Sequence, residues 1–141
     1  MKAISLYGEH WDEIESGEKT EEYRSWSTSY RGDIFICYTG TKEAPGATSI
    51  VAELYDCVPT ENNMYAFKLR NVRYFRPFTV IGKQRIFDID VNLEDLEFFD
   101  PNTDEGVDGY YKAFDEYVKE VNAQYAKKKG ASKGAAKKKP A

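Results

Sequence analysis

Six short segments rich in β-branched and aromatic residues lie between residues 2 and 91, and no other feature of the sequence constrains the fold as strongly. They are residues 2–6, 19–25, 33–39, 49–58, 64–75 and 83–91. Such segments, separated by turn-forming residues, are typical of β-strands. Closure into a small barrel would hide the edges of the sheet. The sequence therefore predicts an α+β domain built on a small β-barrel of about six strands.

Two details of these strands are also predicted from the residues. Pro77 is expected to interrupt the fifth strand, because proline cannot donate a hydrogen bond to a neighbouring strand. In the sixth strand, alternation places four side chains on one face. They are Arg85, Phe87, Ile89 and Val91.

Two further segments have helical character. Residues 8–16 place Trp11 and Ile14 three positions apart, and Gly17 supplies the left-handed residue that ends such a helix. Residues 107–125 form a longer amphipathic helix, with apolar side chains repeating at i, i+3, i+4 and i+7. The members of this face are Val107, Tyr110, Tyr111, Phe114, Tyr117, Val118, Val121 and Tyr125. We expect the face to pack on the barrel, with docking of a partner as the alternative.

The 141 residues suffice for one domain with an added C-terminal region. Residues 1–91 form the predicted barrel, and residues 92–126 form an acidic, aromatic-rich helical extension. Residues 127–141, "KKKGASKGAAKKKPA", are expected to be disordered, because they have no large apolar side chain to bury. The chain has neither an apolar run of membrane-spanning length nor the profile of an export signal at its start, so we expect no membrane contact and a cytoplasmic location.

Charge is divided unevenly along the chain. The formal net charge is −4, but the seven lysines of residues 127–141 leave 13 basic and 24 acidic groups in residues 1–126, a balance of −11. Such a body repels a phosphate backbone at long range, so contact with nucleic acid requires a local patch or the basic tail. The tail either touches nucleic acid without sequence preference or acts only to solubilise the chain.

The segment from residue 68 to residue 87 contains basic and aromatic residues and no acid. Its cations are Lys68, Arg70, Arg73, Arg76, Lys83 and Arg85. Cations interleaved with aromatic rings suit a surface that follows a nucleic-acid backbone, and we predict such a patch at the first four. The alternative is that these cations pair with residues 88–120, which hold 12 acids.

Cysteine and histidine are too sparse to indicate thiol or metal chemistry. Cys37 and Cys57 each lie in an apolar strand, where a free buried thiol is expected. His10 is the only histidine, so a Cys-His pair is poorly supported and a zinc site lacks ligands. The sequence implies neither a metal nor another cofactor.

Opposed charges and aromatic rings crowd into "ESGEKTEEYRSWSTSYRG", residues 15–32. In a regular strand, Glu22 and Arg24 share one face, and Lys19 lies one step beyond the glycine turn. Turned inward, such charges are costly unless each is hydrogen-bonded, so an inward cluster is a candidate site. The alternative is a set of ordinary surface ion pairs.

This stretch resembles the signature of the ASCH domain family, which is related to the PUA fold. The hallmark Gly-x-Lys-x-x-x-x-Arg is matched by Gly17, Lys19 and Arg24. Further matches are Glu22, Ser25, Trp26, Tyr30, Arg31 and Gly32. The resemblance covers residues 1 to about 91 and implies a small PUA-like β-barrel, with a helix near its start and the signature residues along a cleft.

The resemblance also implies functions. Family members are implicated in binding RNA or modified nucleobases, and some hydrolyse the amide of N4-acetylcytidine with a lysine at the position of Lys19, a threonine and a glutamate. Glu22 stands here where that subgroup has its threonine, the late glutamate has no match, and "YGEHW" lacks the proline that many relatives have before the tryptophan. Lys19 is therefore carried over as a site residue, and the hydrolytic mechanism is not.

We predict that the cleft binds RNA, a nucleotide or a modified base. Lys19 and Arg24 would donate, Glu22 would accept, and Trp26 or Trp11 would stack on a base. The predicted ligand-binding set is Gly17, Lys19, Glu22, Arg24, Ser25, Trp26, Trp11, Tyr30 and Arg31. One alternative is a small hydrolase, an amidohydrolase or a ribonuclease, in which Lys19 and Glu22 move protons. Another is a protein-interaction module that uses the C-terminal helix.

Overall fold

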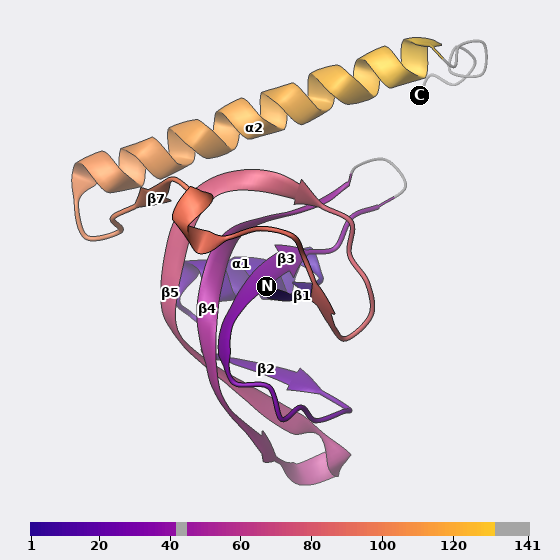
Figure 1. Cartoon of the computed structure of the whole chain (residues 1–141), viewed down its shortest axis with the longest axis vertical. Coiled ribbons are helices and arrows are strands. Elements are labelled where there is room, and N and C mark those ends of the chain that lie inside the picture. Colours follow the sequence, from indigo (N-terminus) through magenta and orange to yellow (C-terminus); the bar gives the residue numbers. More distant parts are fainter. Residues whose placement is uncertain (42–44, 132–141) are drawn as a thin grey trace.

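One mixed β-sheet carries most of the chain and curls into a half-barrel (Figure 1). The computed structural model describes residues 1–41 and 45–131. The strands are β1 (Lys2–Leu6), β2 (Glu21–Arg24), β3 (Gly32–Tyr38), β4 (Gly46–Pro59), β5 (Tyr65–Val80), β6 (Ile86–Asp88) and β7 (Phe98–Phe99). The helices are α1 (Gly8–Ser16) and α2 (Asp104–Ala131), with short 3-10 turns at Glu61–Asn63 and Leu93–Asp95.

The strands run in the order β2-β5-β4-β3-β1-β6, and β7 pairs with β5. The β1–β3 pair is parallel and the other pairs are antiparallel. The two ends of this order, β2 and β6, lie at the rims of the curl, where they do not pair with each other in the described part of the chain. The predicted α+β, PUA-like fold class is confirmed.

Both faces of the central strands are buried. In β3, Ile34 and Ile36 belong to a cluster with Trp11 and Ile14 of α1, whereas Phe35 and Cys37 point into a second cluster on the other face. Alternate side chains therefore enter different cores, which explains why "IFIC" is continuously apolar instead of alternating with polar residues.

Two expectations about the strands are wrong. Strand β5 continues through Pro77 to Val80, because its register with β4 shifts there: Ile50 lies opposite Tyr74, and Thr48 lies opposite Phe78. Pro77 falls in this bulge, where no regular ladder bond requires its missing N–H. Strand β6 is only three residues long, and Arg85 has φ 57°, so Arg85 lies outside the strand whose face it was expected to share.

Helix α1 ends as predicted, because Gly17 adopts φ 85° and its N–H donates to the carbonyl of Ile14. Helix α2 packs through Tyr110 and Ala113, which are buried. The Tyr110 hydroxyl donates to the Glu15 carboxylate of α1 and also bonds to the Ser49 hydroxyl, at 2.8 Å, in β4. A Cβ on Gly106 would lie 1.9 Å from the Asp100 carbonyl oxygen, so this close approach requires glycine.

Helix α2 differs in two ways from the expected amphipathic helix. It continues to Ala131, and so includes residues 127–131 of the segment predicted to be disordered. Residues 132–141 lie outside the described residues, and contact of this tail with nucleic acid stays a prediction. Part of the expected packing face is also left open, since Val107, Tyr111 and Val118 are 36%, 60% and 38% exposed. Over the described residues, neither helix is long and apolar enough to cross a membrane.

Candidate functional site

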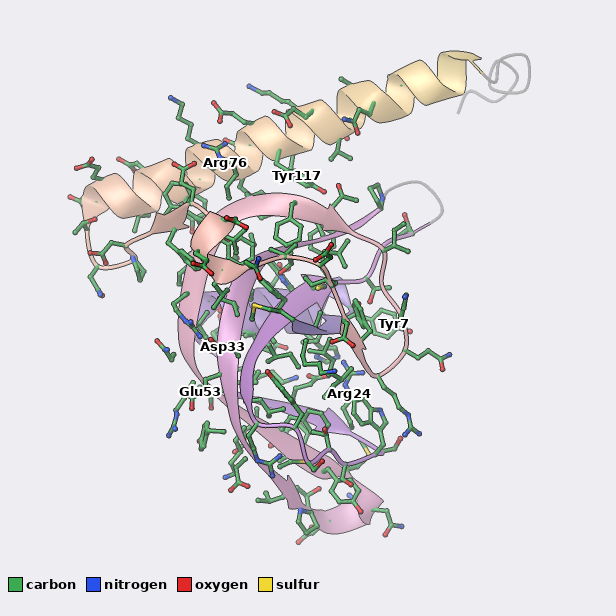
Figure 2. The ribbon with its side chains drawn as sticks, in the orientation of Figure 1. Tyr7, Arg24, Asp33, Glu53, Arg76 and Tyr117 are labelled. Carbon is green, nitrogen blue, oxygen red and sulfur yellow. The ribbon has the colours of Figure 1, made fainter. Side chains whose placement is uncertain are left out.

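A cleft of about 850 Å³ opens at one end of the half-barrel. Its walls come from the corner between β1 and α1, from β2, from the β3–β4 connection and from the β5–β6 loop. Tyr7 and Arg24, which both line the cleft, lie on the same side of the half-barrel in Figure 2. Segments far apart in the sequence therefore meet at this opening.

A closed ion cluster lies at the β2 wall of the cleft. Glu22 is only 7% exposed, and its two carboxylate oxygens accept from Lys19 Nζ at 3.0 Å and Arg24 Nε at 2.9 Å. Arg24 Nη2 also donates to the Ser5 carbonyl at 2.8 Å, which ties β2 to β1. Lys19 Nζ lies 3.3 Å from His10 Nδ1. Each charge has partners, as a cluster withdrawn from water requires.

Local structure explains this convergence. Glu22 and Arg24 are two residues apart in β2 and lie on the same face, whereas the intervening Tyr23 is 47% exposed. Gly17 turns the chain after α1, and the Lys19 N–H then bonds to the Glu13 carbonyl at 3.0 Å. The lysine is thereby held over the end of the helix, within reach of Glu22.

An aromatic ring and further cations complete the cleft. The Trp26 and Phe67 rings pack edge-on, with 5.0 Å between their centroids. The guanidinium carbons of Arg24 and Arg85 lie 5.9 Å and 5.3 Å from the centroid of the Trp26 ring. Lys83 and Arg85 line the β5–β6 side, and neither forms an ion pair with another described residue. Among the described lining residues, Glu22 is the one carboxylate, and it is already paired. The described lining of the cleft therefore carries a net positive charge within an acidic body.

The family model of the ASCH domain matches residues 4–131. The chain belongs to the ASCH domain family. The match includes α2, beyond residue 91, where the resemblance visible in the sequence ends. A mutant of the ASCH protein from Zymomonas mobilis has a similar crystal structure, with a TM-score of 0.50 and 20% identity over 63% of this chain and 89% of that one. At that identity the likeness concerns the fold. None of the curated proteins matches the chain.

Several predicted ligand-binding residues of this ASCH domain lie away from the cleft. Trp11 is 3% exposed and its Nε1 donates to the Ile36 carbonyl at 2.9 Å, so it is a core residue and not a stacking surface. The Tyr30 hydroxyl donates to the Asp33 carbonyl, and Arg31 donates to the carbonyls of Thr28 and Tyr30. These two side chains fix the β2–β3 connection. Neither Ser25 nor Gly17 lines the cleft, and Lys19 is joined to it only through its bond to Glu22.

The predicted nucleic-acid patch of the ASCH domain is neutralised by neighbouring acids. Lys68 pairs with Glu21, Arg70 with Glu53, Arg73 with Asp33, and Arg76 with Glu97 and Glu116. Only Arg76 pairs with the acidic extension. The surplus positive charge of this basic segment lies instead at Lys83 and Arg85, which the sequence-based patch did not include.

The cysteines of the ASCH domain are both free. Burial raises the pKa of Cys37 to about 12, so its nucleophilic thiolate is scarcely populated at neutral pH. In the described residues, no group of three His, Cys, Asp or Glu side chains is placed to hold a metal ion.

Among the cleft residues absent from the predicted set, besides Lys83 and Arg85, are Ser5, Tyr7 and His10. The Ser5 hydroxyl is buried without a hydrogen-bond partner, and a Cβ on Gly82 would lie 2.7 Å from it. Nothing local in the sequence marks these residues, since the sheet topology alone brings β1 beside β2 and the β5–β6 loop. In the sequence, only the density of basic residues around Lys83 indicated that this part of the chain could belong to a binding site.

Proposed function

We propose that this ASCH protein binds a nucleotide, alone or within single-stranded RNA, in the 850 Å³ cleft. The observation that carries the proposal is a positively charged cleft with one accessible indole, inside a body whose residues 1–126 sum to −11. Local positive charge of this kind attracts phosphate that the rest of the surface repels.

The ion cluster supplies fixed hydrogen-bonding groups. Lys19 uses one donor on Glu22, and Arg24 uses Nε on Glu22 and one donor on the Ser5 carbonyl. Because a guanidinium has five donors, Arg24 retains donors for a base edge or a phosphate. Lys19 does not itself line the cleft and acts by holding Glu22 in place. The second lone pairs of the Glu22 oxygens remain as acceptors. The mutual bonds hold these groups in place before a ligand arrives, which lowers the entropy cost of binding.

The aromatic and cationic wall suits a base and its phosphate. Trp26 and the Arg85 guanidinium are both flat groups on which a base stacks. Lys83, from the same loop as Arg85, offers an ammonium without an ion-pair partner in the described structure. A base against Trp26 and a phosphate near Lys83 would use both features together.

Tryptophan fluorescence provides a direct test. The chain has two tryptophans, and Trp11 is buried, so a ligand that quenches emission reports on Trp26. The full-length protein is titrated with each nucleoside 5′-monophosphate and with a short single-stranded RNA, at about 50 mM and about 200 mM salt. We expect saturable quenching that weakens with salt.

Matched charge variants locate the site. Arg85→Ala is expected to weaken binding roughly tenfold, and Lys83→Ala is expected to reduce the dependence on salt by about one phosphate contact. Arg70→Ala removes the same charge outside the cleft and should bind as wild type does. Equal affinity in Arg85→Ala, Arg24→Ala and wild type, or no quenching by any nucleotide, would overturn the proposal.

One observation favours hydrolysis as a second candidate function. Lys19 Nζ lies between Glu22 Oε1 and His10 Nδ1, at 3.0 Å and 3.3 Å, an arrangement in which a lysine can exchange a proton. Incubation with N4-acetylcytidine, and separately with RNA, followed by chromatography, would detect a released product. Turnover that disappears in Lys19→Met supports the enzyme, and no turnover by a nucleotide-binding, folded protein rejects it.

A further inference from the structure

Helix α2 carries an apolar seam that its own chain leaves partly open. Val107, Tyr111 and Val118 are each more than a third exposed, although they lie beside the row that packs on the sheet. With positions 114, 121 and 125 they form a series of apolar residues spaced alternately by four and three. This is the heptad spacing with which helices pair side by side.

The second half of α2 has few contacts with the rest of the molecule. Described side-chain bonds from α2 to other elements come from Tyr110, Glu116 and Tyr117, all in its first half. Figure 1 shows the C-terminal end of the helix extending well beyond the sheet. Its 28 residues span about 42 Å at 1.5 Å per residue. A half-helix with few tertiary contacts is only marginally stable in water.

Charge is segregated along the same helix. Residues 104–120 contain six acids and two lysines, whereas residues 121–131 contain three lysines and no acid. A second copy aligned antiparallel would bring its basic end against the acidic start of the first, and the reverse would hold at the other end. A parallel alignment would place like charges together.

We propose that two copies of this ASCH protein pair through antiparallel α2 helices about a two-fold axis. Aligning the seam about its midpoint sets Tyr111 opposite Val121, Phe114 opposite Val118, and Val107 opposite position 125. The same alignment sets residue 128 opposite Asp104, at the flank of the seam. One register therefore satisfies apolar and charged positions together, and each contact occurs twice, as a two-fold interface requires.

A cavity at the start of the seam supports this occupant. About 310 Å³ lies between α1 and α2, lined by side chains that include Glu15, Tyr74, Phe99, Val107 and Tyr111. In the proposed register, position 125 of the second copy comes to this opening. The second copy would cover the exposed Tyr111 ring and leave the nucleotide cleft, which none of these residues lines, open to solvent.

The test is a charge exchange measured by light scattering or sedimentation on the full chain. At about 100 µM, where a micromolar dimer is formed, wild type should have twice the mass of the chain. The variants Lys128→Glu and Asp104→Lys should each associate at least tenfold more weakly, because each sets like charges opposite one another at both ends of the dimer. An equimolar mixture should regain the dimer mass, because both ends are then complementary.

Two further variants separate pairing from misfolding. Val118→Asp should give a folded monomer, with circular dichroism and thermal unfolding close to those of the charge variants. Lys112→Glu changes charge about 100° round the helix from Tyr111 and should remain dimeric. A monomeric wild type, a dimeric Val118→Asp, or two monomeric charge variants whose mixture stays monomeric would overturn the proposal.

Discussion

The cleft and the outer face of β5 contain the same kinds of ion pair in different surroundings. In the cleft, the Glu22 side chain is 9% exposed and its Lys19 and Arg24 partners are about 20% exposed. On the outer face, Arg70 and Glu53 are 59% and 34% exposed. The bond lengths barely differ, because Arg70 donates two bonds of 3.1 Å and 3.0 Å to Glu53. The length of the ion-pair bonds therefore does not distinguish the pairs of the cleft from those of the neutralised outer surface.

Burial changes what each pair can do. Charges withdrawn from water keep a fixed geometry, and each is costly if left without its partner. Exposed charges exchange protein partners for water at little cost, so their pairing lowers local charge without fixing a binding geometry. The contrast predicts large effects in the cleft and small ones on β5.

The largest effect is expected for Glu22→Ala. The substitution leaves two partly buried cations facing each other without the carboxylate between them, and should lower the free energy of unfolding by about 3 kcal/mol. Glu22→Gln keeps one carbonyl oxygen as an acceptor and should lose less. Urea unfolding of wild type and both variants, with Glu53→Ala as the exposed counterpart, provides the measurement.

The order of stability among these variants tests whether the ion pairs of the cleft differ from those on the outer face of β5. If Glu22→Ala unfolds at the same urea concentration as wild type, water reaches the cluster, and the cleft is no different from the surface. If Glu22→Gln is as damaging as Glu22→Ala, the charge of Glu22 matters more than its hydrogen bonds.

The same contrast explains how much of the molecule could be predicted from its sequence. Composition located all six main strands and helical spacing located both helices, because both are local properties of the sequence. Pro77 and Arg85 were misplaced because a register shift and a positive φ depend on what lies opposite. The common face of Glu22 and Arg24 followed from strand parity, which is also local.

The rest of the site depends on distant segments. Whether a cation lines the cleft or meets an acid is decided by sheet topology, so Lys83 and Arg70 were indistinguishable in the sequence. Trp11 and Trp26 were likewise equivalent, since an indole in a core and an indole at a ligand have the same chemistry. Their surroundings separate them: Trp11 donates to a buried carbonyl, whereas Trp26 lies beside two arginines.

A smaller effect, dependent on pH, is expected where α1 meets α2. Burial raises the pKa of Glu15 from 4.5, and nearby Asp12 adds to the rise, while the hydrogen bond from Tyr110 lowers it. A carboxyl whose pKa is raised on folding binds protons more tightly in the folded state, so ionising it costs stability. That cost is full above the folded pKa and disappears as pH falls towards 4.5.

The Glu15→Gln variant isolates the effect of Glu15 ionisation on stability. The amide keeps an acceptor for Tyr110 and does not ionise, so the variant should be at least as stable as wild type at pH 7. As pH falls from 7 to about 4.5, wild type should gain stability relative to the variant. Urea unfolding of both proteins across this range gives the difference and removes the contribution of other carboxylates. Parallel curves would mean that the Glu15 carboxylate is as well solvated in the folded protein as in the unfolded chain.

The smallest effect is expected for the Arg70–Glu53 pair, even though its geometry is bidentate. The hydrogen bond from Arg70 holds the pKa of Glu53 below its usual value, but solvent and salt screen a pair this exposed. Arg70→Ala, Glu53→Ala and the double variant should all unfold within error of wild type, and any coupling between the two should vanish at high salt. A coupling that persists at high salt, or a loss near that of Glu22→Ala, would show that bidentate geometry stabilises this fold without burial. The distinction between cleft and surface would then rest on which ligands each binds, and no longer on how firmly each is held.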